Sequence, residues 1–308
     1  MLCPFCRSRD QVRKDGTFPR KTGAKPRTQR FYCRACQRRF SQLTGCLDSR
    51  QRRPELHRPL YSLLVSGVSQ RRTARLLGTT QTTVARKVVR IAKFARSFHE
   101  GELRRSPASV STAVFDEMET FEHSKLKPLA IAVAVVEGSR KIIAVSVSSM
   151  PAKGKLAATA RRRYGHRPDH RRQGLAHVLT RLSAVGVAEG LVVKSDQCPR
   201  YPRAVRRYVS RALHLTFKGR RACVVGQGEL KVGGFDPLFA LNHTCAMHRD
   251  NVKRLSRRTW CTTKRPDRLQ CLIDLYICAH NDDIELKRRK RRGQCYLPFL
   301  AIPAPAEM

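Results

Sequence analysis

An apolar segment that runs into acidic residues, Ser111-Thr112-Ala113-Val114-Phe115-Asp116-Glu117-Met118, is the starting point for the predicted fold. We interpret residues 110–116 as a buried strand that ends at Asp116, because a short apolar run is typical of such strands. A second run, Gly190-Leu191-Val192-Val193-Lys194-Ser195-Asp196, ends in Asp196. Carboxylates at strand ends can hold Mg²⁺ or Mn²⁺, so the two segments predict a metal site.

The chain around these segments is strongly basic. Its 308 residues include 63 Lys and Arg against 23 Asp and Glu, which gives a formal net charge of +40. Such a charge favours a polyanionic partner, because each neutralised phosphate releases condensed counterions. No run of about 18 apolar residues is present, and the N-terminus lacks the pattern of a signal peptide. We therefore expect no membrane span and a cytoplasmic location.

Two Cys-x-x-Cys motifs near the N-terminus predict a metal site of a different kind. They are Cys3-Pro4-Phe5-Cys6 and Cys33-Arg34-Ala35-Cys36, separated by 26 residues. Each motif can turn two thiolates toward one ion, so the pair predicts a zinc ribbon over residues 1–45 with Zn²⁺ in a structural role. A redox pair and a coincidence of spacing are the competing interpretations. The scattered remaining cysteines agree with a reducing compartment.

Residues 46–100 are predicted to form a helix-turn-helix domain. Ser69 can cap one helix, Gly78 can adopt a left-handed turn, and Thr80 can cap the next helix. The second helix would then present four side chains to a DNA major groove: Gln81, Thr82, Arg86 and Lys87. An ordinary helical hairpin is the alternative.

The rest of the chain alternates between strand and helix patterns. A hairpin is predicted from strands at 129–136 and 141–147 with a turn at 137–140. The following pattern predicts a helix at 173–186, a strand at 190–195, a helix at 201–209, a strand at 213–217 and a long helix at 237–257. This α/β order resembles the RNase H-like fold, a mixed sheet with flanking helices. The resemblance places the first and fourth strands side by side, so that Asp116 and Asp196 can share metal.

Several motifs together resemble small bacterial insertion-sequence transposases of the DDE type. They are the ribbon ending Cys33-Arg34-Ala35-Cys36-Gln37-Arg38-Arg39-Phe40, the helix-turn-helix, Asp116-Glu117-Met118, and Val252-Lys253-Arg254-Leu255-Ser256-Arg257-Arg258-Thr259-Trp260-Cys261. The resemblance covers nearly the whole chain. It implies a zinc ribbon, a DNA-binding domain, a catalytic core and a basic tail, at residues 1–45, 46–100, 110–283 and 284–308.

The resemblance also implies a function. The protein is expected to bind double-stranded DNA at terminal inverted repeats, and to cleave it and join it to target DNA with Mg²⁺. A homodimer or higher oligomer is expected in the DNA complex, and the location is expected to be nucleoid-associated. Two alternatives stay open. One is a catalytically inactive or domesticated DNA-binding protein, and the other is a nuclease without joining activity.

The third catalytic position departs from the family pattern. The resemblance places Asn242 where such enzymes carry glutamate, and Arg249 two helical turns later as a DNA contact. An Asn carbonyl can bind Mg²⁺, but it adds no charge and cannot act as a base. Three interpretations remain: Asn242 is the third ligand, a nearby carboxylate such as Asp236 or Asp250 replaces it, or the enzyme is inactive.

Two further segments have open roles. The basic block Lys287-Arg288-Arg289-Lys290-Arg291-Arg292 is either a solvated segment or a phosphate contact. Residues 219–235 contain several glycines and are interpreted as an insertion before the late helix, because they match no phosphate-binding loop spacing.

Overall fold

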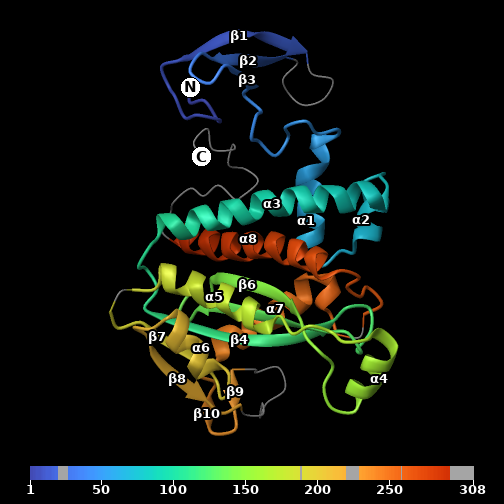
Figure 1. The fold of residues 1–308 in the computed structure, drawn as a ribbon, viewed down its shortest axis with the longest axis vertical. Coiled ribbons are helices and arrows are strands. Elements are labelled where there is room, and N and C mark those ends of the chain that lie inside the picture. The colour runs from blue at the N-terminus through green and yellow to red at the C-terminus, as the bar shows by residue number, and fades with distance from the viewer. Residues whose placement is uncertain (20–26, 188, 220–228, 258, 292–308) are drawn as a thin grey trace.

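The structure is a computed structural model that describes residues 1–19, 27–187, 189–219, 229–257 and 259–291. A small N-terminal sheet lies at one end of the molecule, and helices separate it from a larger sheet (Figure 1). The predicted α/β class, with a small N-terminal unit, a helical segment and a mixed sheet with flanking helices, is confirmed.

The N-terminal sheet is antiparallel and contains β1 (Val12–Pro19), β2 (Arg27–Cys33) and β3 (Arg38–Ser41) in that order. Its core is small: Phe31 stacks on Phe40, with ring centroids 5.5 Å apart, beside buried Cys3 and Cys33. So few apolar side chains cannot offset the entropy of ordering the segment, which makes a bound metal the expected source of stability.

The helical segment contains a 3₁₀ turn, η1 (Pro54–Leu56), followed by α1 (His57–Val65), α2 (Gln70–Leu76) and α3 (Gln81–Arg105). The hydroxyl of Ser69 accepts a hydrogen bond from the Arg72 amide, and that of Thr80 accepts one from the Thr83 amide. Gly78 has a φ of 54°, in the left-handed region. The predicted caps and turn are therefore confirmed.

Five strands form the central sheet: β4 (Thr112–Phe121), β5 (Pro128–Val136), β6 (Ile142–Ser149), β7 (Val192–Asp196) and β8 (Leu213–Phe217). Their order is β6-β5-β4-β7-β8. The first three strands pair antiparallel, whereas β7 is parallel to both β4 and β8. The predicted adjacency of the first and fourth strands is confirmed.

The predicted end of the first strand at Asp116 is wrong. Strand β4 continues five residues further, to Phe121, because β5 stays paired with it from Glu117 opposite Ala132 to Phe121 opposite Pro128. Asp116 therefore lies in the middle of a strand, with its backbone paired to Val133 of β5.

Helices cover both faces of the sheet (Figure 1). One face packs against α5 (Arg171–Val185) and α6 (Tyr201–Tyr208), and the other packs against α7 (Phe239–Asn251) and α8 (Pro266–Arg291). The predicted long helix at 237–257 is interrupted at Val252 and continues only as the short η2 (Lys253–Leu255). Three short elements are additional: α4 (Leu156–Tyr164), β9 (Leu230–Lys231) and β10 (Gly234–Phe235).

The helical segment and the central sheet share one core. Helix α3 packs on α8, which in turn packs on β6, and Arg96 of α3 forms an ion pair with buried Asp274 of α8 at 2.5 Å. These contacts pack the helical segment against the region predicted as the core, residues 110–283. Helix α8 runs from that region into the predicted tail, which begins at residue 284, and ends at Arg291. Among the described residues, no helix combines the length and apolarity needed to span a bilayer.

Candidate metal centres and nucleic-acid interface

The four N-terminal cysteines form one cluster. The sulfur atoms of Cys3, Cys6, Cys33 and Cys36 all lie within 4.8 Å of one another. The Cys3–Cys36 and Cys6–Cys33 sulfur distances are 3.6 and 3.5 Å. Four thiolates around Zn²⁺ at about 2.3 Å have similar separations.

Local backbone geometry positions these thiols. Arg7 and Gln37, which directly follow the two motifs, have φ values of 60° and 55°, so the chain turns sharply after each cysteine pair. Burial opposes ionisation of Cys3, but hydrogen bonds from the Cys6 and Phe5 backbone lower the pKa of its thiol to about 7. The cluster could hold one structural Zn²⁺, because four protein ligands leave no open coordination position.

The two predicted catalytic aspartates lie at matching positions on neighbouring strands. The parallel pairing of β4 with β7 joins Thr112 to Val192 and ends with Val114 opposite Lys194. The same offset, carried two residues further, sets Asp116 beside Asp196, the last residue of β7. Paired strands of a sheet are about 4.8 Å apart, and the charge of Asp196 contributes to the raised pKa of Asp116, so the two carboxylates are close to each other.

Asp116 is held by neighbouring groups. Its Oδ1 accepts hydrogen bonds from the Tyr201 hydroxyl at 2.8 Å and from the Glu117 amide at 2.6 Å. Burial raises the pKa of Asp116 to about 6, and the negative charge of Asp196 adds to the rise. Asp196 accepts a hydrogen bond from the Cys198 amide at 2.9 Å. A cation between the two carboxylates would relieve their repulsion, so the donor set fits Mg²⁺ or Mn²⁺.

Two other acidic residues of β4 form ion pairs with arginine and lysine side chains. Glu117 forms an ion pair with the Arg200 guanidinium at 2.5 Å, and Glu119 forms one with Lys153 at 2.7 Å. The sequence reasoning missed Arg200 and Tyr201. Their position directly after the loop that follows Asp196 was the available signal, since that loop returns to the carboxylates.

The predicted third position, Asn242, lies exposed near the start of α7. Its amide nitrogen donates to Asp236 at 2.7 Å, and Asp236 also accepts from the Leu238 amide at 3.0 Å. Cys245, about one turn after Asn242, is buried close enough to Asp116 for that carboxylate to contribute to its raised pKa, after burial itself. Helix α7 thus packs near β4 with its Cys245 face, whereas Asn242 is exposed beside that face.

The aspartate pair has no third ligand of the usual kinds in the part of the chain that the structure describes. There the four cysteines are the one group of three or more His, Cys, Asp or Glu side chains gathered tightly enough for a metal. Asp236 instead accepts hydrogen bonds from the Leu238 amide and the Asn242 side chain, and Asp250 is exposed near the end of α7. Asparagine is not one of these residue types, so this result does not bear on Asn242 as a ligand.

Three of the four predicted groove-facing side chains are exposed at the start of α3, namely Gln81, Thr82 and Arg86. Lys87 is not: its side chain is buried, and its ammonium donates to the Arg52 carbonyl at 2.9 Å and lies 3.2 Å from His57. The helical period places Lys87 on the same face as Val84 and Ile91, which form the core. Its prediction as a DNA contact is therefore wrong in this conformation.

Other basic side chains of α3 also make internal contacts. The Arg90 guanidinium donates to the carbonyls of Cys46, Leu47 and Ser49, which fixes the segment between the small sheet and α1. Arg249 of α7, the other predicted DNA contact, is half-buried beside Cys245. In the basic block, Arg288 pairs with Glu285 at 2.6 Å, and Arg292 lies outside the described residues.

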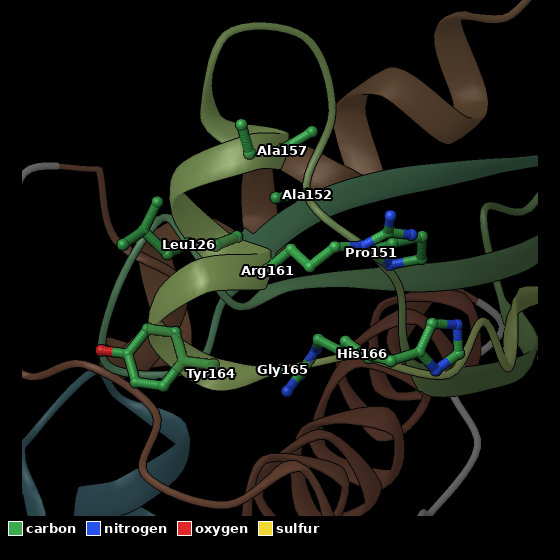
Figure 2. Close-up of a pocket in the computed structure, with 11 residues that line it drawn as sticks. Leu126, Pro151, Ala152, Ala157, Arg161, Tyr164, Gly165 and His166 are labelled. Carbon is green, nitrogen blue, oxygen red and sulfur yellow. The ribbon is translucent and has the colours of Figure 1, made fainter.

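A cavity of about 380 Å³ lies beside α4 (Figure 2). Its lining combines small apolar side chains with the polar groups of Arg161, Tyr164 and His166. The lining contains no carboxylate, so the cavity does not offer Mg²⁺ ligands.

No protein-family model matches the chain, and no match to a curated protein is found.

Proposed function

We propose that this protein is a DNA transposase that binds the ends of an insertion sequence and catalyses Mg²⁺-dependent DNA cleavage and strand transfer. One observation carries the proposal: Asp116 and Asp196 occupy matching positions on adjacent strands, in a sheet ordered β6-β5-β4-β7-β8. That strand order is the one expected for an RNase H-like core. The resemblance of the sequence motifs to insertion-sequence transposases supports the same function.

The proposed chemistry is phosphoryl transfer. Asp116 and Asp196 would hold Mg²⁺, which when bound activates the attacking oxygen and neutralises the leaving oxygen. Tyr201 orients Asp116 by its hydrogen bond, and Arg200 neutralises Glu117, so that the charge at the site belongs to the two aspartates. Asn242 is proposed as the third ligand, and Arg249 as a contact to a phosphate near the cleaved end.

The N-terminal part is proposed to recognise DNA. Gln81, Thr82 and Arg86 are exposed at the first turn and a half of α3, where a recognition helix contacts base edges. The Zn²⁺-bound ribbon adds a second contact region. Two DNA ends must meet for transposition, so a homodimer or higher oligomer is proposed in the DNA complex.

A joining assay tests this function. Purified protein is incubated with the element's terminal DNA, target DNA and Mg²⁺, and joined products are measured beside an Asp196→Ala variant. The proposal expects joined products from the native protein and none from the variant, with end binding unchanged. Hydrolysed ends without joined products would identify a nuclease. Binding without any metal-dependent product would identify a DNA-binding protein without catalysis.

A further inference from the structure

A cleft lined by arginines lies between α5 and α6, beside the aspartate pair. It has a volume of about 390 Å³, and its charged lining consists of Arg172 from α5 and Arg200, Arg203 and Arg207 from α6 and the residue before it. Leu175 and Tyr208 form part of its apolar wall. Figure 1 shows α5 and α6 on the same face of the sheet.

One end of this cleft reaches the carboxylates. Arg200 lines the cleft and also pairs with Glu117 at 2.5 Å, next to Asp116 in β4. Tyr201, the following residue, donates its hydroxyl to Asp116. A chain of two adjacent residues therefore connects the cleft wall with the proposed catalytic site.

The charge of the cleft is largely uncompensated. Arg172, Arg203 and Arg207 are exposed, and among the described residues no Asp or Glu lies within ion-pair distance of them. By contrast, Arg171 and Arg181 on α5 pair with Asp169 and Glu100. Guanidinium groups gathered without acidic partners repel one another, so an anion is the ligand that such a cleft favours.

We infer that this cleft binds the phosphodiester backbone of a DNA strand that leads to or from the aspartate pair. The planar guanidinium groups would contact consecutive phosphates, while the apolar wall packs against the sugars. That the bound strand leads to Asp116 rests on the proposed function, but the binding of DNA phosphate by the cleft can be measured without catalysis.

The test compares the salt dependence of DNA binding. Affinity of the full chain for a random-sequence 30-bp duplex is measured by fluorescence anisotropy between low and moderate salt. The slope of log affinity against log salt is negative, and each lost phosphate contact lowers the magnitude of that slope by about 0.9. The double variant Arg203→Gln, Arg207→Gln is expected to lower that magnitude by about 1 to 2. Arg203→Lys, Arg207→Lys keeps the charge and is expected to retain most of it.

Arg206→Gln is the matched control, since Arg206 is exposed on the same helix but does not line the cleft. Arg172→Gln tests the opposite wall and should also lower the magnitude of the slope. Equal slopes for the Arg203/Arg207 double variant, Arg172→Gln and the native protein would overturn the inference, as would an equal loss with Arg206→Gln. If the native protein joins no DNA but the cleft variants still lower the magnitude of the slope, the proposed function fails while the cleft stands.

Discussion

Asp116 and Asp196 stand side by side, each two residues beyond the last paired residues of β4 and β7. No backbone pairing joins the two strands at that point, although β4 remains paired with β5 and β7 with β8. At the two aspartates the strands are thus held only from their outer sides, by β5 and β8.

Replacing Asp116 by Asn tests the electrostatics of the aspartate pair. The change removes one of two neighbouring charges, and the amide oxygen can still accept the hydrogen bond from Tyr201. Without divalent metal at pH 8, we expect the free energy of unfolding to rise by about 1–2 kcal/mol, while DNA joining is lost. Urea denaturation and the joining assay measure the two effects. Glu189→Gln, on an exposed residue, serves as the control and should change neither.

Substitutions of Asn242 test whether this residue is the third metal ligand of the proposed site. Asn242→Ala should reduce joining strongly, and Asn242→Glu should retain metal-dependent activity because a carboxylate is a better Mg²⁺ ligand. The readout is the rate of joining as a function of Mg²⁺ concentration. Full activity of Asn242→Ala, together with loss of activity in Asp250→Ala or Asp236→Ala, would show that the third ligand has been assigned to the wrong residue.

The cysteine cluster should contain one Zn²⁺ per chain. Cys33→Ser is expected to lose the metal and to unfold the small sheet, because the core around Phe31 and Phe40 is too small to hold it. Metal content by mass spectrometry and proteolysis of the N-terminal region give the readouts. Cys46→Ser is the matched control, since the Cys46 thiol lies outside the cluster, where it donates to the Gln42 carbonyl, and this variant should keep full Zn²⁺ content.

Two adjacent residues of α3 are predicted to have different roles, one in DNA contact and the other in stability. Arg86→Gln should lower affinity for the element's end about five- to tenfold at physiological salt, the range expected for one lost side-chain contact, and should leave stability unchanged. Lys87→Met should instead lower the free energy of unfolding by about 1–3 kcal/mol, because the Arg52 carbonyl loses its partner. Fluorescence anisotropy with DNA of the element's end measures the affinity, and urea denaturation measures the stability. A loss of stability in Arg86→Gln together with a loss of affinity alone in Lys87→Met would contradict the prediction.

Acid should destabilise the protein through His248. The ring is fully buried, its Nδ1 donates to the Thr244 carbonyl, and its Nε2 has no partner among the described residues. Burial lowers the pKa of His248 from 6.5 to about 4. The unfolded state therefore binds a proton first as the pH falls below 6.5, and the folded state loses about 3 kcal/mol by pH 4. His248→Gln should show a smaller loss in denaturation curves at pH 7 and 5, and an unchanged loss would contradict this assignment.

Much of the fold could be predicted from local patterns. The caps at Ser69 and Thr80 and the turn at Gly78 are short-range features, and the strands at 129–136 and 213–217 carry clear apolar patterns. The adjacency of the strands that carry Asp116 and Asp196 is a long-range feature, and it was predicted only from the resemblance of the element order to the RNase H-like fold; the caps, the turn and the strand patterns are local. Such features depend on few neighbours, so a sequence pattern is enough to predict them.

The misplaced features depend on tertiary contacts. Polar residues after Asp116 gave no sign that β5 would keep β4 extended to Phe121. Helix α4 buries only Ala160 and so has no apolar stripe. Helix α8 is buried on several sides between α3 and the sheet, which hides the periodicity of a surface helix. Lys87 was assigned by its charge although its helical position matched the core.

Helix α3 has 25 residues, which corresponds to a rod about 38 Å long. Its first turns carry Gln81 and Arg86, and its later turns rest on α8 against the central sheet. On the proposed function, this stiff helix fixes the distance between the DNA bases that are recognised and the DNA bond that is cleaved. Base pairs inserted between the recognised sequence and the cleavage site should therefore move the recognised sequence away from the cut.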